Sequence, residues 1–209
     1  MLSSLSQFQS KKHYRYLLCK GTTEFAQKKL LIALHGYGQL IPYFAKKFDG
    51  LEKHTSLLFP EGMHRFYLNG TSGRVGASWM TREERLIDIE DNLSWLNELL
   101  EYINSQYEFN EITLLGFSQG GATAARWYFK HQSYFQRLIM WASVFPPDIE
   151  HIEKEVNNGI FVVGNEDPYF LDNMEVACEF YRSNKYKIIR FSGAHDIHLP
   201  TLNLLYNEK

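Results

Sequence analysis

The sequence is poor in the features that mark several large classes of protein. It has only two cysteines, Cys19 and Cys178, which are far apart and form no C-x-x-C pair, so they indicate free thiols in a reducing compartment. It has no excess of basic residues, since 22 Lys and Arg stand against 24 Asp and Glu for a net charge of −2. Because no segment is strongly basic either, a role in nucleic-acid binding is disfavoured.

Long apolar runs are absent as well. No stretch of 18 apolar residues occurs, so we expect no membrane-spanning segment. Residues 1–10 have no basic start, no apolar core and no small-residue cleavage site of a secretory signal. We therefore expect a cytoplasmic protein, and the sequence carries no information on its oligomeric state.

The residues that are present favour one α/β domain. The chain is 209 residues long and 44% hydrophobic, which allows a substantial core, and no linker divides it, so a single domain over residues 1–209 is expected. Short apolar runs alternate with helical patterns, which predicts a mostly parallel central sheet with helices on both faces. Strands are expected at 13–20, 29–34, 56–59, 112–117, 137–143, 159–163 and 187–191, and helices at 42–53, 81–106, after residue 118 and at 171–183.

The most informative stretch is the buried strand that ends in Gly116-Phe117-Ser118-Gln119-Gly120-Gly121. A G-x-S-x-G spacing between a strand and a helix is typical of a nucleophile elbow, a tight turn that lifts the serine hydroxyl above the strand ends. It also directs the Gln119 backbone N–H toward negative charge that develops beside Ser118. The alternative is a plain strand-turn-helix with a capping serine.

A second glycine-containing loop follows the strand at 29–34, with the sequence Leu34-His35-Gly36-Tyr37-Gly38. A dinucleotide fingerprint would need glycine at 41, where Ile41 stands, so a phosphate-binding loop is disfavoured. In a hydrolase, such a loop offers a second backbone N–H, from Tyr37, to the same oxyanion. We interpret His35 as a structural loop histidine rather than a base.

Residues 61–78 contain four glycines and are expected to form an irregular loop that makes one wall of a binding cleft. Trp79 and Met80 are candidates for apolar lining of that cleft, with core packing as the alternative. Thr81 and Glu84 have the spacing of a capping box, which opens the helix expected at 81–106. Its apolar stripe should face the sheet, and it consists of Leu86, Ile89, Leu93, Leu96, Leu100 and Ile103.

Two later strands end in candidate catalytic side chains. Asp167 follows the strand at 159–163, where catalytic residues of open α/β sheets gather, with Glu166 as the second choice. The last strand is followed by Gly193-Ala194-His195, and His195 completes the chain order Ser, Asp, His. His198 lies close by, but Pro200 places it near the N-terminus of a terminal helix, where the dipole disfavours an imidazolium. We therefore predict His195 as the base.

Four motifs occur in order along the chain: Leu34-His35-Gly36-Tyr37-Gly38, Gly116-Phe117-Ser118-Gln119-Gly120-Gly121, Gly164-x-x-Asp167 and Gly193-x-His195. Together they resemble the phospholipase/carboxylesterase family of α/β hydrolases, which includes the acyl-protein thioesterases. The resemblance implies the α/β-hydrolase fold, Ser118 as nucleophile, His195 as base, Asp167 as orienting acid, and the Tyr37 and Gln119 amides as oxyanion hole. The short connection after the strand at 137–143 predicts no lid domain. Two departures concern the substrate: Gln39 stands where the family commonly has an acidic residue, and Pro168-Tyr169-Phe170 where it commonly has Val-Pro.

The expected function is therefore hydrolysis of a small-molecule carboxylic ester or thioester through an acyl-enzyme, without metal or organic cofactor. Lysophospholipase and acyl-protein thioesterase activities are alternatives, because acyl length and leaving group cannot be deduced. A non-catalytic binding protein on the same fold is another. A metal site at His195, Asp196 and His198 is disfavoured, since the spacing differs from H-E-x-x-H and a clear third ligand is missing.

Overall fold

The computed structural model describes residues 6, 8–149, 156 and 158–207. The strands are β1 Tyr16–Cys19, β2 Lys29–Leu34, β3 Ser56–Pro60, β4 His64–Tyr67, β5 Val75–Ser78, β6 Glu111–Phe117, β7 Arg137–Trp141, β8 Gly159–Gly164 and β9 Lys187–Phe191. The α-helices are α1 Glu24–Gln27, α2 Ile41–Phe44, α3 Arg85–Asn104, α4 Gln119–Lys130, α5 Met174–Ser183 and α6 Leu199–Asn207, and the 3-10 helices are η1 Ala45–Phe48, η2 Leu51–Lys53 and η3 Gln132–Tyr134.

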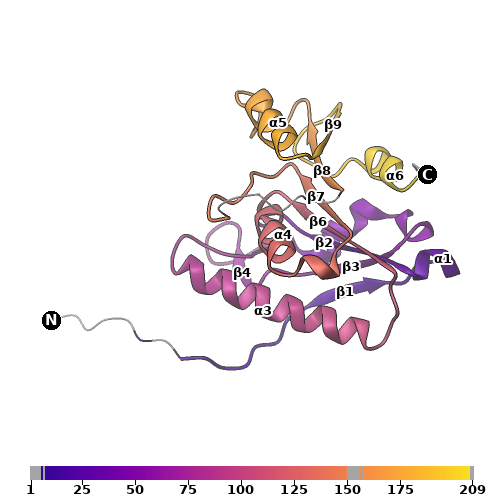
Figure 1. Ribbon diagram of the computed structural model, residues 1–209. Coiled ribbons are helices and arrows are strands. Elements are labelled where there is room, and N and C mark those ends of the chain that lie inside the picture. Colours follow the sequence, from indigo (N-terminus) through magenta and orange to yellow (C-terminus); the bar gives the residue numbers. More distant parts are fainter. Residues whose placement is uncertain (1–5, 7, 150–155, 157, 208–209) are drawn as a thin grey trace.

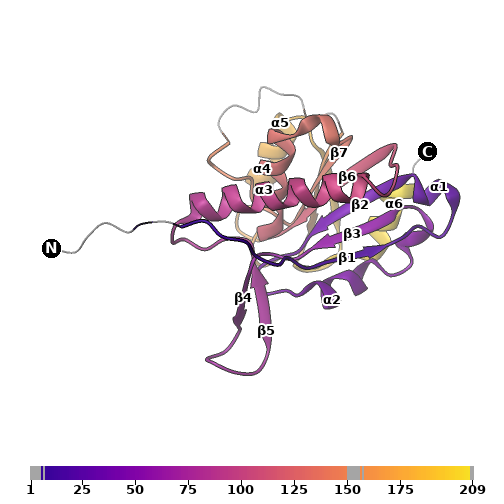
Figure 2. The ribbon, with the colours of Figure 1, turned by 90° about the horizontal axis from the view of Figure 1, so that it is seen from below.

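Seven strands form a central sheet in the order β1-β3-β2-β6-β7-β8-β9 (Figure 1). Only β1 runs antiparallel to its neighbour, β3, and the other paired strands are parallel. Figure 2 shows α3 and α4 on one face of the sheet and α2 on the other. The predicted mostly parallel sheet with helices on both faces is confirmed.

The strands read as continuous apolar runs because helices cover both faces of the sheet. Every residue of β3 and β8 is buried, as are five of the six residues of β2. By contrast, β9 lies at the edge, and Phe191 is its only buried residue. The central strands therefore place the loops at their carboxyl ends on a rigid base.

The long helix α3 begins later than the sequence predicts. It starts at Arg85, and Glu84 before it has a left-handed φ of 48° without a side-chain cap, so the expected capping box of Thr81 and Glu84 is wrong. Thr81 instead donates its hydroxyl to the Glu83 carbonyl, a bond within the turn that precedes the helix. The apolar stripe is buried from Leu93 onward, whereas Leu86, in the first turn, is exposed.

The stretch expected to be an irregular loop at 61–78 contains a β-hairpin, which is a correction of the prediction. β4 and β5 pair antiparallel, with His64 opposite Ser78 and Tyr67 opposite Val75. Figure 2 shows this hairpin extending away from the central sheet. The glycine density that predicted a loop belongs in part to the hairpin turn, where Gly70 and Gly73 both have positive φ.

Parallel strands direct their carboxyl ends to one edge of the sheet. Leu34 at the end of β2 is opposite Gly116 near the end of β6, and Gly164 at the end of β8 is opposite Phe191 at the end of β9. The loops that follow these four strands therefore meet at this edge, where ligands bind in open α/β sheets.

The described residues of the connection from β7 to β8 contain no helix or strand. None of the helices in the described ranges is long and apolar enough to cross a bilayer.

Candidate active site

Ser118 stands between β6 and α4 in a strained backbone conformation. Its φ of 52° and ψ of −120° lie outside the regions that residues with side chains ordinarily adopt. The turn is held by the Ser118 N–H, which donates to the Trp141 carbonyl at 2.9 Å, and by the glycines on either side. A β-carbon on Gly116 would lie 2.3 Å from the Gly121 Cα, and one on Gly120 would lie 2.4 Å from the Leu34 carbonyl oxygen. The sequence G-x-S-x-G therefore follows from close backbone approaches.

Three residues that the sequence singles out form a hydrogen-bonded series. The Ser118 Oγ lies 3.0 Å from His195 Nε2, and His195 Nδ1 lies 2.7 Å from Asp167 Oδ2. When Nδ1 keeps its proton and donates it in a hydrogen bond to the carboxylate, Nε2 is free to accept the serine proton. The loops after β6, β8 and β9 thus bring together side chains that are 28 and 77 positions apart in the sequence.

Asp167 is held in place by contacts other than the one to the imidazole. Its side chain is completely buried, and its second oxygen, Oδ1, accepts the Tyr169 backbone N–H at 3.0 Å. The neighbouring Glu166 is exposed, so the structure separates the first choice from the second. Buried carboxylates need partners, and Asp167 has one for each oxygen.

Two aromatic rings contact the imidazole of His195. The Phe117 ring centroid lies 4.9 Å from that of His195, and the Tyr169 centroid lies 4.5 Å away. Phe117 belongs to the buried end of β6, whereas Tyr169 is 75% exposed. Tyr169 belongs to one of the two departures from the family pattern, and the structure places it directly beside the candidate base.

The loop after β2 lies against the serine. A β-carbon on Gly36 would lie 3.2 Å from the Ser118 Cβ. Within this loop the Gly36 N–H donates to the Gln39 side-chain oxygen at 2.9 Å, and the Gly38 N–H donates to the Ala77 carbonyl at 2.8 Å. The Tyr37 amide makes no hydrogen bond to the residues that the structure describes, so its N–H remains available to a ligand atom.

A second available amide belongs to Gln119, the first residue of α4. The first four N–H groups of a helix have no partner within it, and the helix dipole adds partial positive charge there. An oxygen bound beside Ser118 would meet this N–H on the α4 side and the Tyr37 loop on the β2 side. Both amides are predicted from the sequence as an oxyanion hole, whereas no sequence signal indicates that the Gln39 side chain accepts a hydrogen bond within the loop that carries Tyr37.

His35 is structural, as its place in the sequence suggests. It is completely buried; its Nδ1–H donates to the Gly36 carbonyl at 2.8 Å and its Nε2 accepts the Gly62 N–H at 2.9 Å. Burial lowers the pKa of His35 to about 4, because the charged imidazolium would lose its hydration. The neutral ring therefore ties the β2 loop to the start of the hairpin.

The structure differs from the sequence prediction for Trp79, whose side chain has no exposed surface and cannot line an open cleft. Its indole Nε1–H donates to the His35 carbonyl at 2.8 Å, which joins it to the loop that carries Tyr37. Its backbone carbonyl accepts a hydrogen bond from Asn92 on α3. Trp79 is therefore part of the packed support beneath the site, the alternative that the sequence left open.

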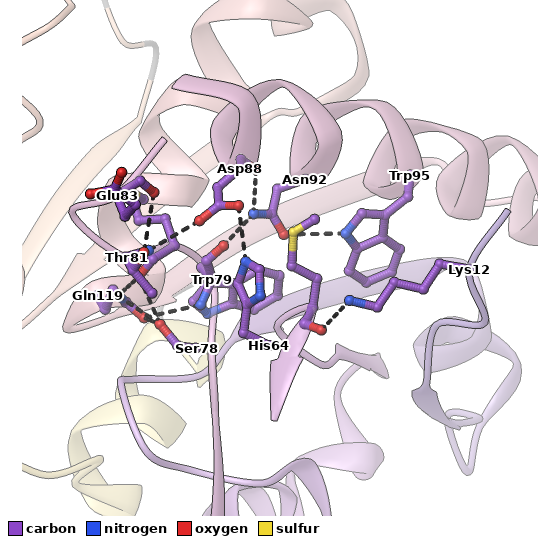
Figure 3. A network of polar contacts seen from close by, with 12 residues as sticks. Lys12, His64, Ser78, Trp79, Thr81, Glu83, Asp88, Asn92, Trp95 and Gln119 are labelled. Atoms are coloured by element: carbon purple, nitrogen blue, oxygen red, sulfur yellow. Dashed lines mark hydrogen bonds and ion pairs between the residues drawn. The ribbon is translucent and has the colours of Figure 1, made fainter. Parts of the chain in front are cut away.

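The Gln119 side chain connects this support to the elbow, and Figure 3 shows the network in which it takes part. Its Oε1 accepts the Trp79 N–H at 3.1 Å, and its Nε2 donates to the Met80 carbonyl at 3.0 Å. Met80 itself is half-buried, with its sulfur 3.8 Å from an Arg126 nitrogen. The spacing of the sequence gives no signal for these contacts, because they join residues 39 to 46 positions apart.

His198 contacts residues other than Ser118. Its Nδ1 lies 2.8 Å from the Thr201 hydroxyl, and its ring stacks on Phe191 with centroids 4.9 Å apart. Asp196 pairs with Lys47 at 2.6 Å. Across the described ranges, no group of three or more His, Cys, Asp or Glu side chains is arranged to hold a metal ion.

Comparison with known proteins bears on the family and on the fold. Residues 23–204 match the family model described as serine hydrolase (FSH1). None of the curated proteins matches the chain. The family match confirms the prediction of a serine hydrolase.

Several solved structures have a similar fold. Esterase PE8 is 19% identical with a TM-score of 0.68, and the match covers 92% of this chain and 96% of that one. The Bacillus cereus carboxylesterase is 17% identical with a TM-score of 0.62, covering 92% of each chain. Acyl-protein thioesterase 2 of Zea mays is 14% identical with a TM-score of 0.65, covering 92% of this chain and 96% of that one. At these identities the likeness establishes the α/β-hydrolase fold.

Proposed function

This chain belongs to the serine hydrolase (FSH1) family, whose model matches residues 23–204, and we propose that it cleaves carboxylic ester or thioester bonds of small molecules through a covalent acyl-enzyme. The observation that carries the proposal is the series Ser118, His195 and Asp167, with distances of 3.0 and 2.7 Å. Such a series is recognised by its geometry, because unrelated folds have arrived at it in different chain orders.

In the acylation step, neutral His195 takes the Ser118 proton at Nε2 while Oγ attacks the carbonyl carbon of the substrate. Asp167 accepts from Nδ1–H, which fixes the tautomer and stabilises the imidazolium that forms. The same imidazolium then donates its Nε2 proton to the leaving group, which is the oxygen of an alcohol or the sulfur of a thiol. Water, deprotonated by His195 in turn, clears the acyl group from Ser118.

The negative charge of the tetrahedral intermediate needs donors that are in place before it forms. The Tyr37 and Gln119 amides fill this role, since neither N–H has to break an existing hydrogen bond before it donates to the intermediate. Preorganised donors of this kind lower barriers because no solvent has to reorient, and one donor is worth about 3 kcal/mol. The Gln39 and Gln119 side chains hold the two loops that carry them.

The test is the rate of hydrolysis of p-nitrophenyl acetate and of an acetyl thioester by the wild type, Ser118→Ala and Asp167→Asn. We expect kcat of Ser118→Ala to fall by about 10⁶. An amide at position 167 would present a donor to Nδ1 and enforce the wrong tautomer, so Asp167→Asn should lose about 10⁴ in kcat. Glu166→Gln is the matched control, because its side chain is exposed one position away.

Retention of wild-type rates by Ser118→Ala would contradict the proposal. Equal losses of kcat in Asp167→Asn and Glu166→Gln would contradict the role of Asp167 and leave the role of Ser118 intact. Hydrolysis of the thioester but not of the oxygen ester would favour the thioesterase alternative, which the name of the Zea mays structure also suggests.

A further inference from the structure

An apolar groove of about 310 Å³ opens beside His195, between the loops that follow β7 and β8 and the helix α5. Its floor is formed by the buried rings of Phe145, Phe170 and Tyr181. Its rim carries Val144, Tyr169 and Val176, which are 72%, 75% and 70% exposed. None of the described residues that line it is charged.

This exposure needs an explanation, because apolar side chains gathered on a surface mark binding sites more often than isolated ones do. The volume lies in the range of small-molecule sites. It corresponds to roughly ten water-sized volumes of about 30 Å³ each. A flexible chain of about eight carbons would therefore fill much of the groove.

The groove adjoins the candidate active site through Tyr169. Tyr169 forms part of its rim and also contacts the His195 ring at 4.5 Å. Ser143 also lines the groove and lies close to the start of α4, because a β-carbon on Gly121 would lie 2.1 Å from the Ser143 Oγ. The Tyr181 hydroxyl donates to the Ser143 carbonyl at 2.8 Å, which fixes α5 against this loop.

The order of the strands decides which part of a substrate meets the groove. The Tyr37 loop follows β2, on one side of β6 and Ser118, whereas the groove is lined by the loops that follow β7 and β8, on the other side. His195 and Asp167 are on the same side as the groove. The group that leaves the tetrahedral carbon must take its proton from His195 Nε2, so it departs toward the groove.

We propose that this groove binds the apolar chain of the leaving group, so that the preferred substrates are esters or thioesters of apolar alcohols or thiols. The inference rests on the proposed function, since the leaving group is defined only if Ser118 is acylated. Tyr169 is then a specificity-determining residue that covers both the imidazole and the first carbons of the chain.

The experiment uses alkyl acetates from methyl to octyl, with release of acetic acid followed by titration at constant pH. All of them give the same acetyl-enzyme, so kcat/KM isolates the acylation step and its leaving group. Each methylene that enters the groove should raise kcat/KM by about two- to fourfold, because burial of one methylene is worth up to that factor. A parallel series of p-nitrophenyl esters, from acetate to octanoate, varies the acyl chain instead.

Two variants of α5 alter the groove. Ala177→Leu fills it, and we expect the ratio of kcat/KM for octyl over methyl acetate to fall at least about tenfold. Val176→Gln makes the exposed rim polar and should lower the same ratio by about threefold, with little risk to folding because the side chain is mostly in solvent. Leu86→Gln, at a similarly exposed helical position on α3, is the control and should keep the wild-type ratio.

A flat alkyl series in the wild type would overturn the proposal. So would variants that alter the acyl series and spare the alkyl series, since the groove would then hold the acyl chain. If hydrolysis of every ester depended on Ser118 but showed no response to chain length, the role of the groove would be overturned and the proposed function would stand. Absence of Ser118-dependent hydrolysis of any ester would overturn both this inference and the proposed function.

Discussion

Replacement of Trp79 by phenylalanine tests the support beneath the site. The indole Nε1–H donates to the His35 carbonyl at 2.8 Å in a region without exposed surface. Phenylalanine keeps an aromatic ring there but removes the donor, so the change leaves a buried carbonyl without this partner. That carbonyl belongs to the loop that carries the Tyr37 amide.

The expected loss of stability follows from two terms. A buried acceptor that loses its donor costs about 1–3 kcal/mol. The smaller ring leaves a cavity that costs on the order of 1 kcal/mol more. The free energy of unfolding should therefore fall by about 2–4 kcal/mol, a large part of the roughly 5–15 kcal/mol typical of a folded protein, and urea unfolding measures it.

The kinetic effect distinguishes support from lining. Because Trp79 has no exposed surface, its replacement should lower kcat by a similar factor for every ester in a chain-length series. Trp95→Phe is the matched control: Trp95 packs parallel to Trp79 with ring centroids 6.3 Å apart, but its indole donates to the Asn92 side chain on its own helix. It should cost stability with a smaller loss of kcat.

A loss confined to long chains in Trp79→Phe, with unchanged stability, would refute this reasoning. It would place Trp79 on the wall of a substrate pocket, one of the two alternatives that the sequence left open.

Three further predictions concern the loops that follow β2 and β9 and the histidines that these loops carry. His195→Ala should lower acylation by roughly three orders of magnitude or more, whereas His198→Ala should retain most of kcat; the opposite pattern would exchange their roles. Gln39→Leu removes the acceptor of the Gly36 N–H and should lower kcat about tenfold with little change in KM, so a change in KM alone would count against a positioning role. Burial lowers the pKa of His35 from 6.5 to about 4, so between these values the unfolded chain binds a proton that the folded chain does not, and the free energy of unfolding falls as the pH falls. Urea unfolding at pH 7 and pH 5 should show a loss about 2 kcal/mol larger in the wild type than in His35→Gln, and equal losses would disprove the assignment.

The elements that could be predicted are those whose local pattern agrees with their burial. β2, β6 and β9 begin and end within one residue of the expected ranges, because each is a short apolar run closed by glycine or a polar turn. Ser118, Asp167 and His195 could be predicted because strand ends fix where such side chains emerge. Parallel strands then bring those ends to one edge of the sheet whatever the intervening sequence.

The features that could not be predicted depend on contacts between distant segments. Glycines in the 61–78 stretch indicate flexible backbone from the sequence alone, yet β4 and β5 form there because pairing between the two strands satisfies their backbone groups. Thr81 and Glu84 have the right spacing for a cap, but the chain turns at Glu84 with φ of 48° before the helix starts. Trp79 is buried, and its indole donates to the carbonyl of His35, 44 positions away.

Labelling by a fluorophosphonate probe tests most directly whether Ser118 is the covalent nucleophile. Intact-mass measurement should show one adduct on the wild type, and peptide mapping should place it on Ser118. Ser118→Ala should remain unlabelled, while Ser143→Ala, which alters the neighbouring serine beside Gly121, should still be labelled. Equal labelling of the wild type and Ser118→Ala, or an adduct that maps to another serine, would contradict the assignment.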